Sequence, residues 1–283
     1  MKHAILGPGG VGGLIGGALA RSGHPVTFIT REPGYPARIS VESEKLGDFE
    51  VEVVAVTRLE TPVDVLWVTT KATQLDAALA SAPARLVDGT VVPLLNGVDH
   101  VARLREAYAA VTPGTIRVEA EKLAPGRFAQ RGPFIAVELA GVMASDVAAD
   151  LKAAGIDAWE GDDEVSTLWR KLVILAPLAL TTTATMRSIG GVRDDPQWRE
   201  RLLGVFDEAC EVAAALGARI DREASRGALL AMPDFMRSSM QKDKERERPL
   251  ELDAIAGPIV RGGRDHRIPT PHTAILMSLL GQL

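Results

Sequence analysis

Cysteine is almost absent from this chain of 283 residues, in which Cys210 is the only one. A single thiol cannot form an internal disulfide, and it cannot supply a cysteine-based zinc cluster. Cys210 lies in an apolar-periodic run, residues 202–216, which indicates a buried structural thiol rather than a reactive one. A chain of this length buries roughly three-quarters of its unfolded surface, so a hydrophobic core is sufficient to hold the fold.

The sequence also lacks a large excess of charge and a long hydrophobic run. Its 32 basic and 37 acidic residues give a net charge of −5, which argues against a nucleic-acid partner bound through a basic surface. No stretch of 18 consecutive apolar residues occurs, and the N-terminal segment is too rich in glycine for a signal peptide. The sequence therefore predicts a cytoplasmic protein with no membrane partner, and nothing in it indicates a metal.

The two halves of the chain differ in periodicity. Short β-rich runs alternate with helical segments in the first half, which predicts βαβ units on a parallel sheet covered on both faces. The expected strands are residues 2–6, 25–30, 49–56, 63–69 and 90–95, with more strand in 117–138, and the expected helices are 11–22, 74–84 and 144–154. After about residue 162 the pattern is helical throughout, at 163–184, 196–216, 222–230, 234–262 and 271–280.

Residues 7–12 carry the strongest local motif, Gly-Pro-Gly-Gly-Val-Gly, which fits Gly-x-Gly-x-x-Gly between the first strand and the first helix. Gly7 permits the tight turn, Gly9 lets the backbone approach a pyrophosphate, and Gly12 lets the helix pack closely on the strand. A glycine-rich turn without a ligand is the alternative, but the position within a βαβ unit favours dinucleotide binding. The expected cofactor contacts here are Gly7, Pro8, Gly9, Gly10, Val11 and Gly12.

We therefore predict an α/β fold with two domains. Residues 1–161 form an N-terminal Rossmann-like, doubly wound dinucleotide-binding domain, and residues 162–283 form an all-helical C-terminal domain for substrate binding and catalysis.

Arg31 follows the second expected strand, where an NAD enzyme usually has an acidic residue. A guanidinium group there can bind the 2′-phosphate of NADPH through two hydrogen bonds. Glu32, the next residue, would instead suit the ribose of NAD. The sequence thus favours NADPH, with NAD as the alternative.

Six further motifs follow the glycine loop in order along nearly the whole chain. They are Thr-Lys-Ala-x-x-Leu at 70–75, Leu-Asn-Gly-Val at 95–98, Leu-Trp-Arg-Lys-Leu at 168–172, Ser-Ser-Met-x-x-Asp at 238–243, Arg-Pro-x-Glu-Leu-Asp-Ala-Ile-x-Gly at 248–257 and Ile-Pro-Thr-Pro at 268–271. Together they resemble the ketopantoate reductase family (2-dehydropantoate 2-reductases). The resemblance implies NADPH-dependent reduction of the ketone of a small 2-oxo acid, ketopantoate to pantoate, in pantothenate biosynthesis.

The resemblance also implies roles for five residues. Lys171 matches the general acid, a cation placed where negative charge develops on the ketone oxygen. Glu251 matches the carboxylate that binds substrate hydroxyls and orients the lysine, and Ser239 matches the serine that binds the substrate carboxylate. Asn96 contacts both nicotinamide and substrate in the family, and Lys71 follows a strand at the edge of the sheet that binds the cofactor. Without the resemblance, Lys171 and Glu251 would be interpreted as solvated helix residues and Asn96 as a turn residue.

Three positions depart from the family pattern. Leu175 and Ala179 replace asparagines that hold the polar substrate, and Met236 replaces another polar residue. Apolar replacements weaken recognition of hydroxyl groups and favour a bulkier or more apolar ketone. Ketopantoate and such a ketone therefore both stay open as substrates.

Two further alternatives concern the chemistry itself. Related two-domain enzymes, the 3-hydroxyacid, 6-phosphogluconate and opine dehydrogenases, include several that use a catalytic histidine, and His100 is the histidine expected nearest the cofactor. A non-enzymatic NADPH-binding sensor would explain the lost polar groups, although Lys171 and Glu251 argue against it. The sequence is compatible with a homodimer but does not decide the oligomeric state.

Overall fold

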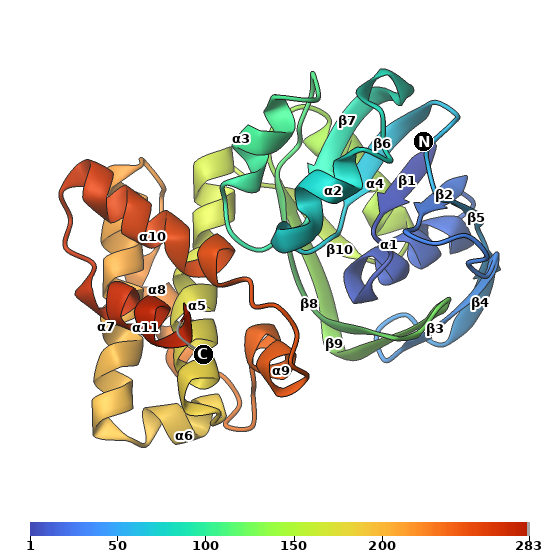
Figure 1. Cartoon of the computed structure of the whole chain (residues 1–283). Coiled ribbons are helices and arrows are strands. Elements are labelled where there is room, and N and C mark those ends of the chain that lie inside the picture. The colour runs from blue at the N-terminus through green and yellow to red at the C-terminus, as the bar shows by residue number, and fades with distance from the viewer. Residues whose placement is uncertain (282–283) are drawn as a thin grey trace. The chain divides into compact units, whose positions relative to one another are not determined.

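The computed structural model describes residues 1–281 and divides the chain into two compact units (Figure 1). Unit 1 comprises Met1–Leu95 and His100–Thr167, and unit 2 comprises Asn96–Asp99 and Leu168–Leu283. The division differs from the expected boundary after residue 161 because Thr167 still belongs to unit 1, where its hydroxyl donates a hydrogen bond to Glu138. The short excursion Asn96–Asp99 into unit 2 was not expected, since no local pattern marks it.

Unit 1 is built on a five-stranded sheet in which every pairing is parallel. The strand order is β5 (Val54–Val56), β2 (Val26–Ile29), β1 (His3–Leu6), β6 (Val63–Val68) and β7 (Val87–Pro93). From β1 the order runs to β2 and β5 on one side and to β6 and β7 on the other. The direction of winding therefore reverses between β1 and β6, and in open α/β sheets ligands bind outside the carboxyl ends of the strands at such a point.

Helix α1 (Gly10–Arg21) lies between this sheet and a second one. The second sheet has the order β10 (Asp157–Glu160), β9 (Arg127–Leu139), β3 (Arg38–Ser43) and β4 (Phe49–Glu52), and β8 (Gly114–Ala124) pairs with β9. Glycines let both sheets approach the helix, because a Cβ atom on Gly16 would collide with Phe28 of β2 and one on Gly13 with Phe128 of β9. The sequence did not predict this second sheet, which covers the side of α1 that faces away from the first one.

The remaining helices of unit 1 are short. They are α2 (Leu75–Leu79), α3 (His100–Arg105) and α4 (Ala144–Ala153), with 3₁₀ turns at Ala72–Gln74 and Ala84–Leu86. The helix expected over residues 74–84 thus ends early, because Pro83 has no N–H group and disfavours helical geometry in the residue before it.

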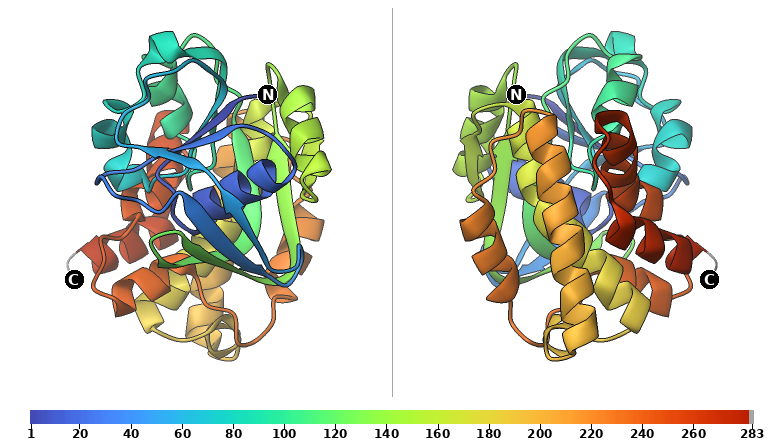
Figure 2. Two further views of the ribbon diagram at one scale, coloured as in Figure 1. Left: turned by 90° about the vertical axis from the view of Figure 1, so that its right-hand side faces the viewer. Right: turned by 90° about the vertical axis from the view of Figure 1, so that its left-hand side faces the viewer.

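The C-terminal region is helical, as the sequence predicts. Its helices are α5 (Glu164–Thr185), α6 (Ile189–Arg193), α7 (Pro196–Ala215), α8 (Arg222–Leu230), α9 (Ser239–Glu245), α10 (Leu252–His266) and α11 (Pro271–Gly281). Helix α7 packs against α6, α10 and α11 (Figure 2). The single helix expected over residues 234–262 is wrong: it is divided by Glu247, which has a positive φ of 52°, and by Pro249.

Helix α5 is long and apolar enough to cross a membrane by length and composition alone. Its most apolar 18-residue window is 72% buried inside the protein, however, and the core helix of a globular protein passes the same test. This helix is therefore weak evidence for a membrane span.

Candidate active site

The loop after β1 is a tight turn that leads directly into α1. Gly7 has a positive φ of 83°, and its carbonyl oxygen accepts a hydrogen bond of 2.7 Å from the N–H of Gly9. Gly9, the N-cap residue, has no side chain with which to cap the helix, and the first turn of α1 carries no acidic residue. The first N–H groups of α1 and the positive end of its dipole are thus suited to an anion.

Two threonines follow β6 beside this turn. Thr69 Oγ1 lies 3.2 Å from the Leu6 carbonyl oxygen and 2.9 Å from that of Gly7, and it ties the two strand ends together. Thr70 packs on Gly7 and carries a buried hydroxyl oxygen that finds no hydrogen-bond partner within residues 1–281. A glycine turn, an uncapped helix N-terminus and an unsatisfied hydroxyl together fit the ribose-phosphate chain of a dinucleotide.

Two other predicted cofactor residues, Lys71 and Arg31, lie in unit 1 with the glycine loop, whereas Asn96 belongs to unit 2. Lys71 follows Thr70 directly, at the N-cap of the 3₁₀ turn Ala72–Gln74. Arg31 and Glu32 are both exposed after β2, and neither side chain forms an ion pair with any described residue. The two side chains that would select between a 2′-phosphate and a 2′-hydroxyl are therefore accessible.

Within unit 2, Asn96 joins Lys171 to Glu251. Lys171 Nζ donates a hydrogen bond of 3.0 Å to Asn96 Oδ1, and Asn96 Nδ2 donates one of 3.1 Å to Glu251 Oε2. The amide therefore presents its oxygen to the cation and its nitrogen to the carboxylate. Glu251 is buried, whereas Lys171 and Asn96 are half-buried. The structure thus brings together three residues that the sequence predicted for the site.

Local backbone geometry sets this arrangement. Glu251 is the N-cap residue of α10, and its carbonyl oxygen accepts the Ile255 N–H at 3.1 Å. Gly97 has a positive φ of 84°, and a Cβ there would collide with the carbonyl oxygen of Ala254. The absence of a side chain at Gly97 therefore lets the Asn-Gly turn lie directly on the first turn of α10, next to Glu251.

Arg261 stabilises the same turn through two carboxylates. Its guanidinium donates hydrogen bonds to Asp99 Oδ2 at 2.5 Å and to Asp253 Oδ1 at 2.7 Å. Asp99 belongs to the turn segment and Asp253 to α10, so Arg261 links the two backbone pieces that position Asn96 and Glu251. Sequence reasoning missed Arg261, which nothing in its local pattern distinguishes from a solvated helix residue.

The predicted substrate residue Ser239 is the first residue of α9 and is exposed. The preceding Ser238 is buried, accepts the Gln241 N–H at 3.0 Å, and lies 2.8 Å from the hydroxyl of Thr182 on α5. Thr182 lies three helical turns beyond Lys171, about 16 Å along the axis at 1.5 Å per residue. Ser239 therefore lies near the opposite end of the α5 face that carries Lys171.

Two of the three substituted positions, Leu175 and Ala179, lie on α5, and Met236 precedes α9, where its carbonyl oxygen accepts the N–H of Ile189. Leu175 lies one turn beyond Lys171 and is half-buried, and Leu178 follows with 8% of its surface exposed. Ala179 is fully buried and presents no surface, and Met236 is half-buried. The face is thus charged at Lys171, apolar at Leu175 and Leu178, and polar again at Thr182.

A separate group of titratable residues lies in unit 1, where possible ligand atoms of His3, His24 and Asp150 are all within 4.8 Å of one another. Such spacing suits a metal ion, but the hydrogen bonds oppose one. Trp67 Nε1 donates to His3 Nδ1 at 3.1 Å, so the proton of the neutral ring is on Nε2, which donates to Asp150 Oδ2 at 3.1 Å. Since a metal needs the Nε2 lone pair, we interpret the group as a hydrogen-bond network.

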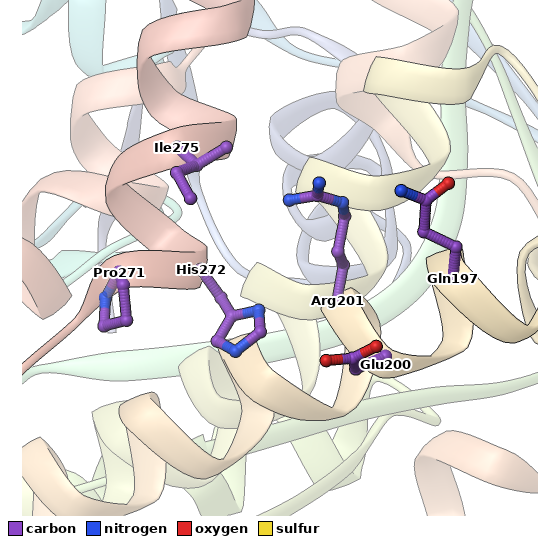
Figure 3. Close-up of a pocket in the computed structure, with 6 residues that line it drawn as sticks. All are labelled: Gln197, Glu200, Arg201, Pro271, His272 and Ile275. Carbon is purple, nitrogen blue, oxygen red and sulfur yellow. The ribbon is translucent and has the colours of Figure 1, made fainter.

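Figure 3 shows a pocket between α7 and α11 in unit 2. Its lining consists of Gln197, Glu200, Arg201, Pro271, His272 and Ile275. No residue predicted for catalysis or binding is among them. His100, the alternative catalytic histidine, is buried in α3 of unit 1.

Comparison with known proteins decides the family. The family model described as ketopantoate reductase PanE/ApbA matches residues 3–139, and the model of its C-terminal part matches residues 164–283. The chain belongs to the ketopantoate reductase family. The 2-dehydropantoate 2-reductase of Mycobacterium tuberculosis is 31% identical over 288 residues, which cover 98% of this chain and 96% of the relative. The resemblance predicted from the motifs is thus confirmed.

Solved structures show the same fold. A ketopantoate reductase of Ralstonia eutropha is similar with a TM-score of 0.90 at 27% identity, covering 100% of this chain and 98% of the other. D-mandelate dehydrogenase in complex with NADH and anilino(oxo)acetate gives a TM-score of 0.89 at 22% identity, with 100% and 98% covered. The predicted fold class is confirmed. As a ketopantoate reductase family member the protein is an oxidoreductase acting on CH–OH groups, and the family uses a nicotinamide cofactor.

Proposed function

We propose that this family member reduces the ketone of a small 2-oxo acid with NADPH, and that ketopantoate is its substrate in pantothenate biosynthesis. The observation that carries the proposal is the hydrogen-bonded chain from Lys171 through Asn96 to Glu251. It places an ammonium group and a buried carboxylate at opposite ends of one amide, which is an arrangement suited to a polar substrate. We expect the protein to be cytoplasmic, as the sequence indicates.

The nicotinamide cofactor, when bound, supplies a hydride to the carbonyl carbon. Lys171 Nζ donates a proton to the ketone oxygen as negative charge develops there, and its own positive charge stabilises that oxygen. Asn96 Oδ1 accepts one N–H of Nζ and so fixes the direction of the ammonium group. Glu251 accepts hydrogen bonds from substrate hydroxyls and holds the amide in its orientation.

Arg31 supports the choice of NADPH. Its guanidinium is exposed after β2 and is not engaged by a described carboxylate, so it can bind a 2′-phosphate. Lys71 and the glycine loop would hold the rest of the dinucleotide at the same edge of the sheet.

Steady-state NADPH oxidation with ketopantoate tests the proposal, with Lys171→Ala as the critical variant. Loss of a general acid costs about 10²- to 10⁴-fold in kcat. Lys152→Ala, an exposed lysine of α4, is the matched control and should retain activity. NADPH binding without turnover of any 2-oxo acid would instead favour a sensor, and Lys171→Ala at full activity would exclude the assigned role.

A second candidate substrate is a 2-oxo acid with an apolar side chain. The observation that favours it is the apolar surface of Leu175 and Leu178 between Lys171 and Thr182 on one face of α5. The same fold also serves an enzyme named D-mandelate dehydrogenase. Comparing kcat/KM for ketopantoate with that for 2-oxo acids carrying branched or aromatic side chains decides between the two. For an apolar substrate, Leu175→Asn would lower kcat/KM with that acid and raise it with ketopantoate.

Size-exclusion chromatography with light scattering would determine whether the active protein is a monomer or the homodimer that the sequence left open. Activity measured across the eluted peak would assign the reaction to one of the two forms.

A further inference from the structure

Thr70 stands at the point of unit 1 where the sheet reverses its winding. Gly7 follows β1, and Thr70 is the second residue after β6, the strand hydrogen-bonded to β1. The two residues therefore flank the position outside the strand ends where open α/β sheets bind ligands.

Thr70 and Gly7 are in direct contact. A Cβ atom on Gly7 would lie 2.5 Å from Thr70 Cγ2 and 3.3 Å from its Cα and N atoms, and Gly7 has a positive φ of 83°. No side chain can separate the two residues, so the threonine forms part of the surface of the glycine turn. The methyl carbon Cγ2 faces Gly7, so the methyl group of Thr70 makes the packing contact with the glycine.

The hydroxyl group of Thr70 lacks a hydrogen-bond partner among residues 1–281. Thr70 Oγ1 is shielded from solvent. Its neighbour Thr69 shows the contrast, because two backbone carbonyl oxygens lie within 3.2 Å of that hydroxyl. A buried hydroxyl without a partner is destabilising, and a ligand that supplies an acceptor recovers the loss on binding.

We infer that the Thr70 hydroxyl donates a hydrogen bond to an oxygen of the cofactor's ribose-phosphate chain. The inference rests on the proposed binding of NADPH and names a contact outside the glycine motif. Ribose and phosphate oxygens are the acceptors that a dinucleotide presents to the turn, and a bond to a charged phosphate oxygen is stronger than one between neutral groups.

The inference predicts two effects of opposite sign for Thr70→Val, which keeps the methyl contact with Gly7 and removes only the hydroxyl. The dissociation constant for NADPH should rise about 10-fold, because one hydrogen bond to the cofactor is lost. The cofactor-free protein should become more stable, with Tm higher by about 2 °C, because an unsatisfied buried group is gone. A threonine with a purely structural role would give neither the weaker binding nor the higher Tm.

The dissociation constants are measured by titrating the full-length protein with NADPH and following protein fluorescence, and Tm is measured on the cofactor-free protein. Thr70→Ser retains the hydroxyl and should bind NADPH within about twofold of the original protein. Thr61→Val, at an exposed threonine of the same unit, is the matched control and should change neither quantity.

Wild-type affinity in Thr70→Val would overturn the inference, as would a lower Tm of the cofactor-free variant, which would mean that the hydroxyl is already satisfied. Equal weakening by Thr70→Ser and Thr70→Val would also overturn it, because shape rather than the hydroxyl would then be responsible. If the unaltered protein failed to bind NADPH, the proposed function itself would be wrong, and this outcome is distinguishable from the others.

Discussion

Substituting glutamine for His3 tests how burial of one imidazole limits the stability of unit 1 in acid. His3 lies on β1 with 1% of its surface exposed, between Trp67 of β6 and Asp150 of α4. His24 lies with its ring centroid 5.1 Å from that of His3, and the amino group of Met1 is 3.6 Å from Asp150. These are the titratable and charged groups that face the ring.

Burial lowers the pKa of His3 from 6.5 to about 4, more than the nearby Asp150 carboxylate raises it. Between these two pH values His3 is protonated in the unfolded chain but neutral in the folded protein. The free energy of unfolding therefore falls as pH decreases from about 6.5 to about 4. At 1.36 kcal/mol per pKa unit, the full loss is about 3 kcal/mol, and about 2 kcal/mol of it is reached near pH 5.

Urea unfolding of wild-type and His3→Gln protein, near pH 7.5 and near pH 5, measures this loss. Glutamine does not titrate, and its amide can donate to Asp150 while its oxygen accepts the Trp67 N–H. We expect the wild-type protein to lose about 2 kcal/mol more than the variant between the two pH values. The neighbouring groups are present in both proteins, so their contributions largely cancel in the difference. An equal loss in both proteins would refute the reasoning.

Three further predictions concern the cofactor and the catalytic residues. Arg31→Ala should raise the dissociation constant for NADPH about 10-fold and leave that for NADH unchanged, as fluorescence titration would show; equal effects on both would contradict the 2′-phosphate contact. Asn96→Asp places a second carboxylate against Glu251 and should lower kcat/KM about 100-fold in the NADPH assay, whereas unaltered kinetics would exclude a bridging role for the amide. Gly97→Ala places a Cβ against the Ala254 carbonyl at a residue with positive φ, and it should lower the free energy of unfolding by about 2 kcal/mol, as urea unfolding would show. An unchanged free energy of unfolding would mean that the turn adapts to the side chain without strain.

Several elements could be predicted from the sequence because their signals are local. The strand at residues 3–6, the glycine turn and the helix that follows are encoded within about 20 consecutive residues, and the structure places them as expected. The helical C-terminal region was likewise evident from its periodicity. The helical periodicity of residues 234–262 continues through Pro249, which disfavours helical geometry, so the pattern predicts one helix where the structure has α9 and α10.

The second sheet was less predictable because its strands pair over long distances in sequence. Strand β3 pairs with β9 in parallel, Ser40 against Arg127, and no local pattern records such a partner. One sign of the second sheet in the local sequence is a glycine of α1, because Gly13 is required where Phe128 of β9 approaches the helix. The sequence alone indicated a dinucleotide motif there, whereas packing between two sheets explains why the glycines continue along the helix.

The candidate site divides in the same way. The sequence by itself indicated which side chains to expect at the site, because motifs that resemble the family point to the ammonium group of Lys171, the amide of Asn96 and the carboxylate of Glu251. Only the tertiary structure decided that the amide lies between the other two, across separations of 75 and 155 residues. It also decided that the buried hydroxyl of Thr70 has no hydrogen-bond partner among residues 1–281. Hydrogen-bond satisfaction depends on which groups meet after the chain has folded, and local periodicity carries no information about those distant neighbours.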